Sequence, residues 1–251
     1  MSKVLVLDSG IGGLTVVKSM SQLLPRLSID YVADNLFFPY GTKTQAELKQ
    51  RLLFLIERQL QSSDYDAIVI ACNSASTLVL DEIRKQINLP IVGVVPAIKP
   101  AAQLSKNKRI GLLATEATVN GQYVDQLIEQ FANDCHVTKV ASQQLVLLAE
   151  IKLQGLPLDF QSVAEIVKPF IEQKSDVVVL GCTHFPWFKS ELTERYPDIA
   201  WIDSGEAIAR RVSEIIPKTE ASQDSELQFF ATGNPYQRSF LSQFHSIEKL
   251  K

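Results

Sequence analysis

Predicted strands alternate along this chain with stretches in which apolar residues recur every three or four positions. In the first part of the chain the strands cover residues 4–7, 29–32, 67–71 and 91–95, and residues 48–60 carry a leucine or isoleucine at every fourth position. Short apolar runs are typical of buried strands, and the fourfold spacing places an apolar face on a helix. Strands and helices alternating at these lengths predict a parallel sheet with right-handed βαβ crossovers.

The pattern restarts near residue 109 and repeats through the second part of the chain. Predicted strands there cover residues 109–114, 136–140, 177–180 and 200–202. The helices predicted between them cover residues 119–131, 145–153, 159–174, a stretch from about 187, and 206–216. Residues 226–231 predict one more strand, which returns to a sheet.

Capping and breaking residues set the ends of several helices. Thr44 followed by Glu47 is typical of a capping box, in which each side chain bonds the backbone N–H of the other. Gly155 follows the helix predicted over 145–153 and is a typical C′ glycine. Pro169 lies well inside the helix predicted over 159–174, so we expect a kink or an earlier end there.

One phrase occurs twice with a constant offset. Asp66 and Asp176 each precede an apolar run that ends in a cysteine, Cys72 and Cys182, and both pairs are 110 residues apart (176 − 66 and 182 − 72). A repeat of this length indicates a duplicated domain. The predicted fold class is therefore α/β, with two similar parallel-sheet βα domains related by pseudo-twofold symmetry and the active site in the cleft between them. That symmetry would turn the two cysteines toward one another.

Composition narrows the class of protein. The 251 residues are 46% hydrophobic and 21% charged, and 25 basic against 28 acidic residues give a net charge of −3. The absence of a basic stripe argues against a nucleic-acid partner. The apolar stretch at the N-terminus is too short for a signal peptide, and no uncharged run approaches the roughly 18 residues of a membrane span. We therefore expect a soluble, cytoplasmic protein with reduced cysteines.

Two of the three cysteines are candidates for catalysis. Cys135 has no matching context, and an isolated free cysteine is usually a small buried hydrophobe. Cys72 and Cys182 each end a predicted strand, at the sheet edge where α/β proteins bind ligands. A thiolate on one side of a carbon can remove a proton while a thiol on the other side donates one, which inverts a stereocentre by two-base catalysis.

Each cysteine has polar neighbours that can assist proton transfer. Asp8 ends the first predicted strand, on the same sheet edge as Cys72. His184 lies two residues after Cys182, and Glu150 lies in a preceding helix. A free thiol has a pKa of about 8.5, and an acid beside it raises that value further, so these groups are better suited to moving or positioning protons than to stabilising a thiolate.

Four motifs together resemble glutamate racemase of the aspartate/glutamate racemase superfamily. They occupy residues 8–16 (DSGIGGLTV), 39–41 (PYG), 71–76 (ACNSAS) and 181–186 (GCTHFP), and they occur in the order and spacing of that family over essentially the whole chain. The family usually has Asn-Thr where this chain has Asn73-Ser74, which keeps the hydroxyl. The resemblance implies a racemase that needs no pyridoxal phosphate or metal, interconverts L- and D-glutamate, and supplies D-glutamate for peptidoglycan.

The resemblance also assigns residues and domains. It implies that Cys72 and Cys182 are the catalytic acid/bases and that Asp8, Glu150 and His184 assist them. The substrate-binding residues that it implies are Asp8, Ser9, Tyr40, Gly41, Asn73, Ser74, Thr183 and His184. It divides the chain into an N-terminal domain of residues 1–95 plus 209–251 and a second domain of residues 96–208. A homodimer is compatible with the sequence, which does not determine the oligomeric state.

Other interpretations compete with this one. The turn at residues 10–13, with Asp34 after the next strand, partly matches a dinucleotide-binding fingerprint, although Thr15 occupies the third glycine position. A metal site would need ligands assembled around Cys182 and His184, and a redox disulfide lacks the C-x-x-C spacing. Aspartate racemase, and a binding module for acidic ligands without turnover, remain the alternatives in function.

Overall fold

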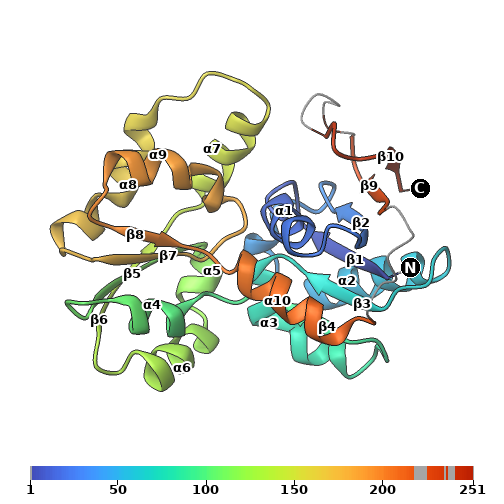
Figure 1. Cartoon of the computed structure of the whole chain (residues 1–251), viewed down its shortest axis with the longest axis horizontal. Coiled ribbons are helices and arrows are strands. Elements are labelled where there is room, and N and C mark those ends of the chain that lie inside the picture. The colour runs from blue at the N-terminus through green and yellow to red at the C-terminus, as the bar shows by residue number, and fades with distance from the viewer. Residues whose placement is uncertain (1, 218–224, 235, 237–240, 251) are drawn as a thin grey trace. The chain divides into compact units, whose positions relative to one another are not determined.

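The chain divides into two compact units (Figure 1). The computed structural model describes residues 2–217, 225–234, 236 and 241–250. Unit 1 comprises Met1–Val94 and Gly205–Lys251, and unit 2 comprises Val95–Ser204. The second crossover between the units falls before the helix Gly205–Ile215, whereas the sequence placed it inside that helix, after residue 208. The whole helix packs on the first helix of unit 1, which is why it belongs there.

Unit 1 contains a six-stranded parallel sheet in the order β10-β9-β2-β1-β3-β4. Its strands are β1 (Lys3–Asp8), β2 (Ser28–Ala33), β3 (Ala67–Ile70), β4 (Ile91–Gly93), β9 (Leu227–Ala231) and β10 (Ser246–Lys249). Its helices are α1 (Leu14–Leu23), the 3-10 turn η1 (Tyr40–Thr42), α2 (Gln45–Leu60), α3 (Asn73–Arg84) and α10 (Gly205–Ile215). Strands β2 and β3 are buried along their whole length, as parallel strands covered on both faces should be.

Unit 2 contains a four-stranded parallel sheet in the order β6-β5-β7-β8. Its strands are β5 (Arg109–Ala114), β6 (His136–Ala141), β7 (Val177–Leu180) and β8 (Ala200–Ile202). Its helices are α4 (Ile98–Leu104), α5 (Glu116–Val119), α6 (Gln122–Phe131), α7 (Gln144–Leu153), α8 (Phe160–Glu172), the 3-10 turn η2 (Phe185–Phe188) and α9 (Lys189–Arg195). The order β6-β5-β7-β8 matches β2-β1-β3-β4 of unit 1, so the prediction of two similar parallel-sheet domains is confirmed.

The two repeated aspartates, Asp66 and Asp176, make similar hydrogen bonds at the amino edges of the two sheets. The Asp66 carboxylate accepts the backbone N–H of Lys3, at the start of β1, at 2.9 Å. The Asp176 carboxylate accepts the Ser105 hydroxyl and the Lys106 N–H, both at 2.6 Å, in the turn that leads to β5. Each aspartate therefore ties the start of a cysteine-bearing strand to the chain entering the strand beside it.

Replacing Asp176 by alanine is expected to destabilise the protein by about 1–3 kcal/mol, the usual cost of losing charge-assisted hydrogen bonds. Burial acts to raise the pKa of Asp176, but hydrogen bonds from Ser105, Asn107 and Lys106 outweigh it and hold that pKa below its ordinary value. The contribution is therefore complete above the unfolded pKa of about 4 and is lost as the pH falls through the lower folded value. Thermal melting of both proteins from pH 7 to pH 3 measures it.

The difference in melting temperature between wild type and D176A should narrow as the pH falls below about 4. Ser105→Ala, which removes one of the hydrogen bonds and keeps the carboxylate, should cause a smaller loss at pH 7. A difference that stays constant with pH would contradict the assigned role of the carboxylate.

Several helix ends follow their predicted signals. Thr44 and Glu47 form the predicted capping box at the start of α2. Gly155 follows the C-cap residue of α7 with a φ of 71°, the left-handed conformation that favours glycine. Pro169 does not end α8, which continues for three more residues to Glu172.

Two elements differ from the predictions. The helix predicted over 119–131 is two helices, α5 and α6, because Gly121 takes an extended conformation as the N-cap of α6. Strand β10 was not predicted at all. Its residues are half-buried or exposed, and it pairs only at the edge of the unit 1 sheet, so it lacks the apolar pattern of an inner strand.

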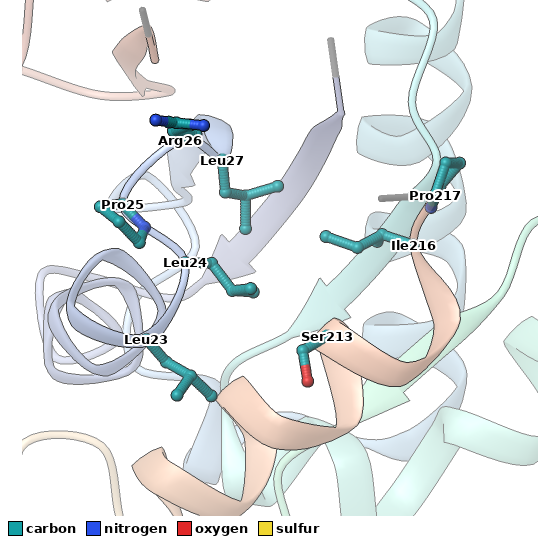
Figure 2. Close-up of a pocket in the computed structure, with 8 residues that line it drawn as sticks. All are labelled: Leu23, Leu24, Pro25, Arg26, Leu27, Ser213, Ile216 and Pro217. Atoms are coloured by element: carbon teal, nitrogen blue, oxygen red, sulfur yellow. The ribbon is translucent and has the colours of Figure 1, made fainter. Parts of the chain in front are cut away.

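Unit 1 also carries a pocket of about 440 Å³ that lies away from the carboxyl edge of its sheet (Figure 2). Figure 2 shows its lining residues, which are Leu23, Leu24, Pro25, Arg26, Leu27, Ser213, Ile216 and Pro217. Leu23 and Ser213 lie in the last turns of α1 and α10, and residues 24–27 lead from α1 into β2, so the pocket belongs to the amino edge. Among the described residues, no helix combines the length and the apolar character needed to cross a membrane.

Candidate active site

The carboxyl edge of the unit 1 sheet brings together the polar residues that follow β1 and β3. Leu7 pairs with Ile70, and the Ala71 N–H donates to the Leu7 carbonyl oxygen at 2.8 Å. Asp8, the last residue of β1, and Cys72, two residues after β3, therefore lie at the ends of neighbouring strands. This is the edge at which open parallel sheets bind their ligands.

Asp8 holds the glycine-rich turn that follows β1. Its buried carboxylate accepts the backbone N–H of Ser9 at 2.8 Å and that of Gly13. A Cβ at position 13 would lie 2.8 Å from the Tyr31 hydroxyl and 2.9 Å from the Asp8 carboxylate, so the turn closes on Asp8 only with glycine there. Because Asp8 uses the Gly13 N–H, the turn loses a donor that a phosphate-binding loop would need.

Cys72 is the N-cap residue of α3, and its side chain is almost buried. The partial positive charge at the N-terminus of this twelve-residue helix favours a thiolate over a thiol. Asn73 and Ser74 open the helix, and both are buried. Within the described ranges no acceptor meets the Asn73 Nδ2 group, which suits it to a ligand oxygen.

Tyr40 and Gly41 form the turn η1 on a loop after β2. Tyr40 is fully buried, and its hydroxyl donates to the Asp34 carboxylate at 2.9 Å. Burial, followed by the negative charge of Asp34, holds the pKa of Tyr40 well above its ordinary value, and Cys72 and Asp8 act in the same direction. The phenol is therefore neutral, and its hydroxyl is already bonded to Asp34. The groups of this turn that suit a ligand are its backbone amides.

The sequence indicated Asp34 only through the partial dinucleotide-binding match, and it did not indicate Arg51 as functional. The Arg51 guanidinium binds the Asp34 carboxylate through Nε at 2.8 Å and Nη2 at 2.6 Å. Asp34 is fully buried and occupied, which removes the ribose-binding role that a dinucleotide site would require. The only sequence signal was an aspartate directly after a predicted strand.

Unit 2 carries a chain of three groups at the carboxyl end of β7. Cys182 lies two residues after that strand, and its Sγ atom is 3.9 Å from Nδ1 of His184. The Nε2 atom of His184 is 2.8 Å from the Glu150 carboxylate. His184 is buried and Glu150 is largely buried, so little water competes for these contacts. Thr183, between the cysteine and the histidine, is buried as well.

The carboxylate determines which nitrogen of His184 carries the proton in the neutral ring. A carboxylate can only accept, so Nε2 donates to Glu150, and Nδ1 keeps its lone pair toward Cys182. Nδ1 can therefore accept the thiol proton, and Glu150 stabilises the imidazolium that results. The arrangement suits a cysteine that alternates between acid and base.

Lys152 holds the Glu150 helix against the turn that follows His184. Its Nζ atom donates to the Trp187 carbonyl oxygen at 2.5 Å and forms an ion pair with Glu191. Glu150 and Lys152 lie on α7, whereas Trp187 lies on η2 and Glu191 on α9. These contacts hold the helix that carries Glu150 beside the segment that follows His184. The sequence did not indicate this role for Lys152.

Cys135 differs from the other two cysteines. It was expected to be a buried core residue, but the structure places it half-buried in the turn before β6, an edge strand. Burial and the neighbouring Asp134 carboxylate raise the pKa of its thiol. A thiol with a raised pKa is a poor base near neutral pH, in keeping with a residue outside the reaction.

Comparison with known proteins identifies the family. The protein-family model described as "Asp/Glu/Hydantoin racemase" matches residues 4–212, which is most of the chain. The chain belongs to the Asp/Glu/Hydantoin racemase family. As a member of that family it is a racemase, and the resemblance to glutamate racemase inferred from the four motifs is confirmed by its relatives.

Curated and solved relatives of this racemase agree. Glutamate racemase from Shewanella sp. (strain MR-7) is 46% identical over 91% of this chain and 88% of its own. The Vibrio cholerae enzyme is 43% identical over 96% and 91% of the two chains. Escherichia coli glutamate racemase, solved with L-glutamate and the activator UDP-MurNAc-ala, has a TM-score of 0.90 and 38% identity, covering 99% of this chain and 98% of its own.

Proposed function

We propose that this racemase interconverts L- and D-glutamate by two-base proton transfer between Cys72 and Cys182. The observation that carries the proposal is the equivalent position of the two thiols. Cys72 follows β3, which pairs with β1, and Cys182 follows β7, which pairs with β5; β3 and β7 hold the same place in the matching strand orders of the two units. The glutamate racemases among the relatives support glutamate as the substrate.

The proton balance of the proposed step is simple. In one direction a Cys72 thiolate takes the α-proton, so the Cα–H bond breaks and an S–H bond forms. The Cys182 thiol gives a proton to the opposite face of the carbanion, so its S–H bond breaks and a new Cα–H bond forms. The reverse direction exchanges the two roles, and no external acid, base or oxidant is consumed.

The two thiols receive different help. Cys72 lies at the N-terminus of α3 on the same sheet edge as Asp8. Cys182 faces a histidine that is itself bound to Glu150. Under the proposal, a helix terminus supports a standing thiolate on one side and an imidazole exchanges a proton with the thiol on the other.

Substrate binding is assigned to buried donors at the same two edges. The Asn73 amide and the Ser9 and Ser74 hydroxyls supply donors from unit 1, together with the backbone of the turn at Tyr40. In unit 2 the substrate contacts are assigned to Thr183 and His184. Donors grouped in this way suit the two carboxylates of an acidic amino acid.

The proposed reaction has one more consequence for the cell. Its product, D-glutamate, is proposed to supply peptidoglycan synthesis, and the enzyme is proposed to act in the cytoplasm. Reduced cysteines persist there, as the mechanism requires.

Exchange of the α-proton in heavy water tests the proposal. Purified protein, treated with chelator and given no cofactor, is expected to exchange the α-proton of L- and D-glutamate and to invert both enantiomers. NMR follows the α-proton, and circular dichroism follows the handedness. Aspartate in parallel serves as the matched substrate, shorter by one methylene group.

The outcomes separate the alternatives. Exchange and inversion with glutamate alone support the proposal. Activity with aspartate instead would identify an aspartate racemase. Inactivity toward both, in folded protein with reduced thiols, would leave a binding module for acidic ligands.

A further inference from the structure

Asp34 accepts hydrogen bonds from three separate elements of unit 1. The donors are the Tyr40 hydroxyl at 2.9 Å, the Arg51 guanidinium at 2.6 and 2.8 Å, and the Thr232 hydroxyl at 2.7 Å. They belong to η1, to α2, and to the residue after β9. Asp34 is fully buried, so water cannot replace a donor that is lost. Each lost hydrogen bond therefore leaves a carboxylate oxygen without a partner, which lowers the stability of the fold.

Arg51 holds Asp34 through a rigid contact. Its guanidinium binds both carboxylate oxygens, and its centre lies 5.8 Å from the Phe37 ring and 5.7 Å from the Phe54 ring. Flanking rings and a bidentate pair restrict where the guanidinium can sit. The hydrogen bond to Asp34, only partly opposed by burial, raises the pKa of Arg51, so the guanidinium stays charged.

Thr232 closes the other side of Asp34. Its hydroxyl accepts the Leu36 N–H at 3.1 Å as well as donating to Asp34, and its own N–H donates to the Ala33 carbonyl oxygen at 3.1 Å. The residue after β9 thus grips the chain on both sides of Asp34, from a position 198 residues away in sequence. Pairing of β9 with β2 uses only backbone groups, so the hydrogen bond from the Thr232 hydroxyl to Asp34 is additional to it.

We propose that Thr232 is a positioning residue for the racemase reaction, which acts through Asp34 to hold the Tyr40–Gly41 turn. The proposal rests on the proposed function, because the backbone of that turn is assigned there to the substrate. The hydroxyl of Thr232 orients the carboxylate, the carboxylate orients the phenol of Tyr40, and the phenol sets where the backbone amides point. The last strands of the chain thereby support a binding turn near its beginning.

Thr232→Val tests the hydroxyl because valine has the shape of threonine without the donor. We expect KM for glutamate to rise about fivefold to tenfold and kcat to change less than twofold, since binding is affected more than proton transfer. Thr232→Ser, which restores a hydroxyl, should return KM to within about twofold of wild type. Initial rates in both directions, taken well below the melting temperature, give both constants.

A matched control uses Thr138 in β6 of unit 2. Within the described ranges its hydroxyl is buried without a hydrogen-bond partner, so Thr138→Val removes the same atoms from a place where they make no bond. KM and kcat should stay within about twofold of wild type. If Thr232→Val fails to fold, Arg51→Lys tests the same carboxylate by keeping the charge and losing the bidentate contact, and it should raise KM similarly.

The results distinguish failure of this inference from failure of the proposed function. Wild-type protein that racemises neither enantiomer of glutamate would overturn the proposed function and this inference with it. An active wild type with unchanged KM in Thr232→Val, or in Arg51→Lys where that variant is used, would overturn the positioning role alone. A KM raised equally in Thr232→Ser would also overturn it, because the hydroxyl would then not be the cause.

Discussion

Replacing Cys72 or Cys182 by serine is expected to lower kcat for glutamate racemisation by about 10²–10⁴-fold, the usual contribution of a general acid or base. A hydroxyl is a far weaker acid than a thiol, and each direction of the proposed reaction needs one sulfur as base and the other as acid. Either substitution should therefore slow racemisation in both directions. Circular dichroism of glutamate solutions measures the rate.

Each serine variant should retain half of the chemistry. With a glutamate analogue that carries chloride on its β-carbon, removal of the α-proton expels chloride, so only the base is needed. Each variant should eliminate chloride from one enantiomer, and the two variants should prefer opposite enantiomers. Cys135→Ala, the matched control, should keep wild-type racemisation, and undiminished racemisation in either serine variant would rule out the two-thiol mechanism.

His184→Asn is expected to lower kcat by about 10²-fold or more, because Cys182 loses the group that accepts its proton. The carboxylate of Glu150 would then face an amide, which cannot carry the positive charge of an imidazolium. Elimination that starts from Cys182 should fall, whereas elimination that starts from Cys72 should be largely preserved. The two enantiomers of the chloride-bearing analogue report on the two sides separately.

Glu150→Gln provides the graded comparison. It keeps the histidine and weakens only its support, so the loss should be smaller than that of His184→Asn. Equal losses for both enantiomers in His184→Asn would contradict the assignment of this histidine to Cys182 alone.

Apart from β10, the strands could be predicted from sequence, and so could the places at their ends of the two thiols proposed as catalytic, because the signals are local. An apolar run followed by a small residue and a cysteine specifies a buried strand and its carboxyl end, whatever the rest of the chain does. The same applies to the capping box at Thr44, where both partners lie three residues apart. Glu150 also reaches His184, from a helix whose apolar pattern was readable.

The support around the site could not be predicted, because its partners meet only in the folded chain. Asp34 meets Thr232 across 198 residues, and Lys152 meets Glu191 across 39. Each is an ordinary polar residue in its local sequence, with no periodicity to indicate its partner. Strand β10 was missed for a related reason, since an exposed edge strand carries no apolar alternation.

The chain returns to unit 1 only after all of unit 2, and this has a consequence for synthesis. Unit 2 is contiguous from Val95 to Ser204, so it can fold as soon as it leaves the ribosome. Unit 1 must wait for α10, β9 and Thr232, and until then the edge of β2 that pairs with β9 is open and Asp34 lacks one of its donors. Until Thr232 is made, a nascent chain therefore lacks part of the support for the Tyr40–Gly41 turn, which is proposed to bind the substrate.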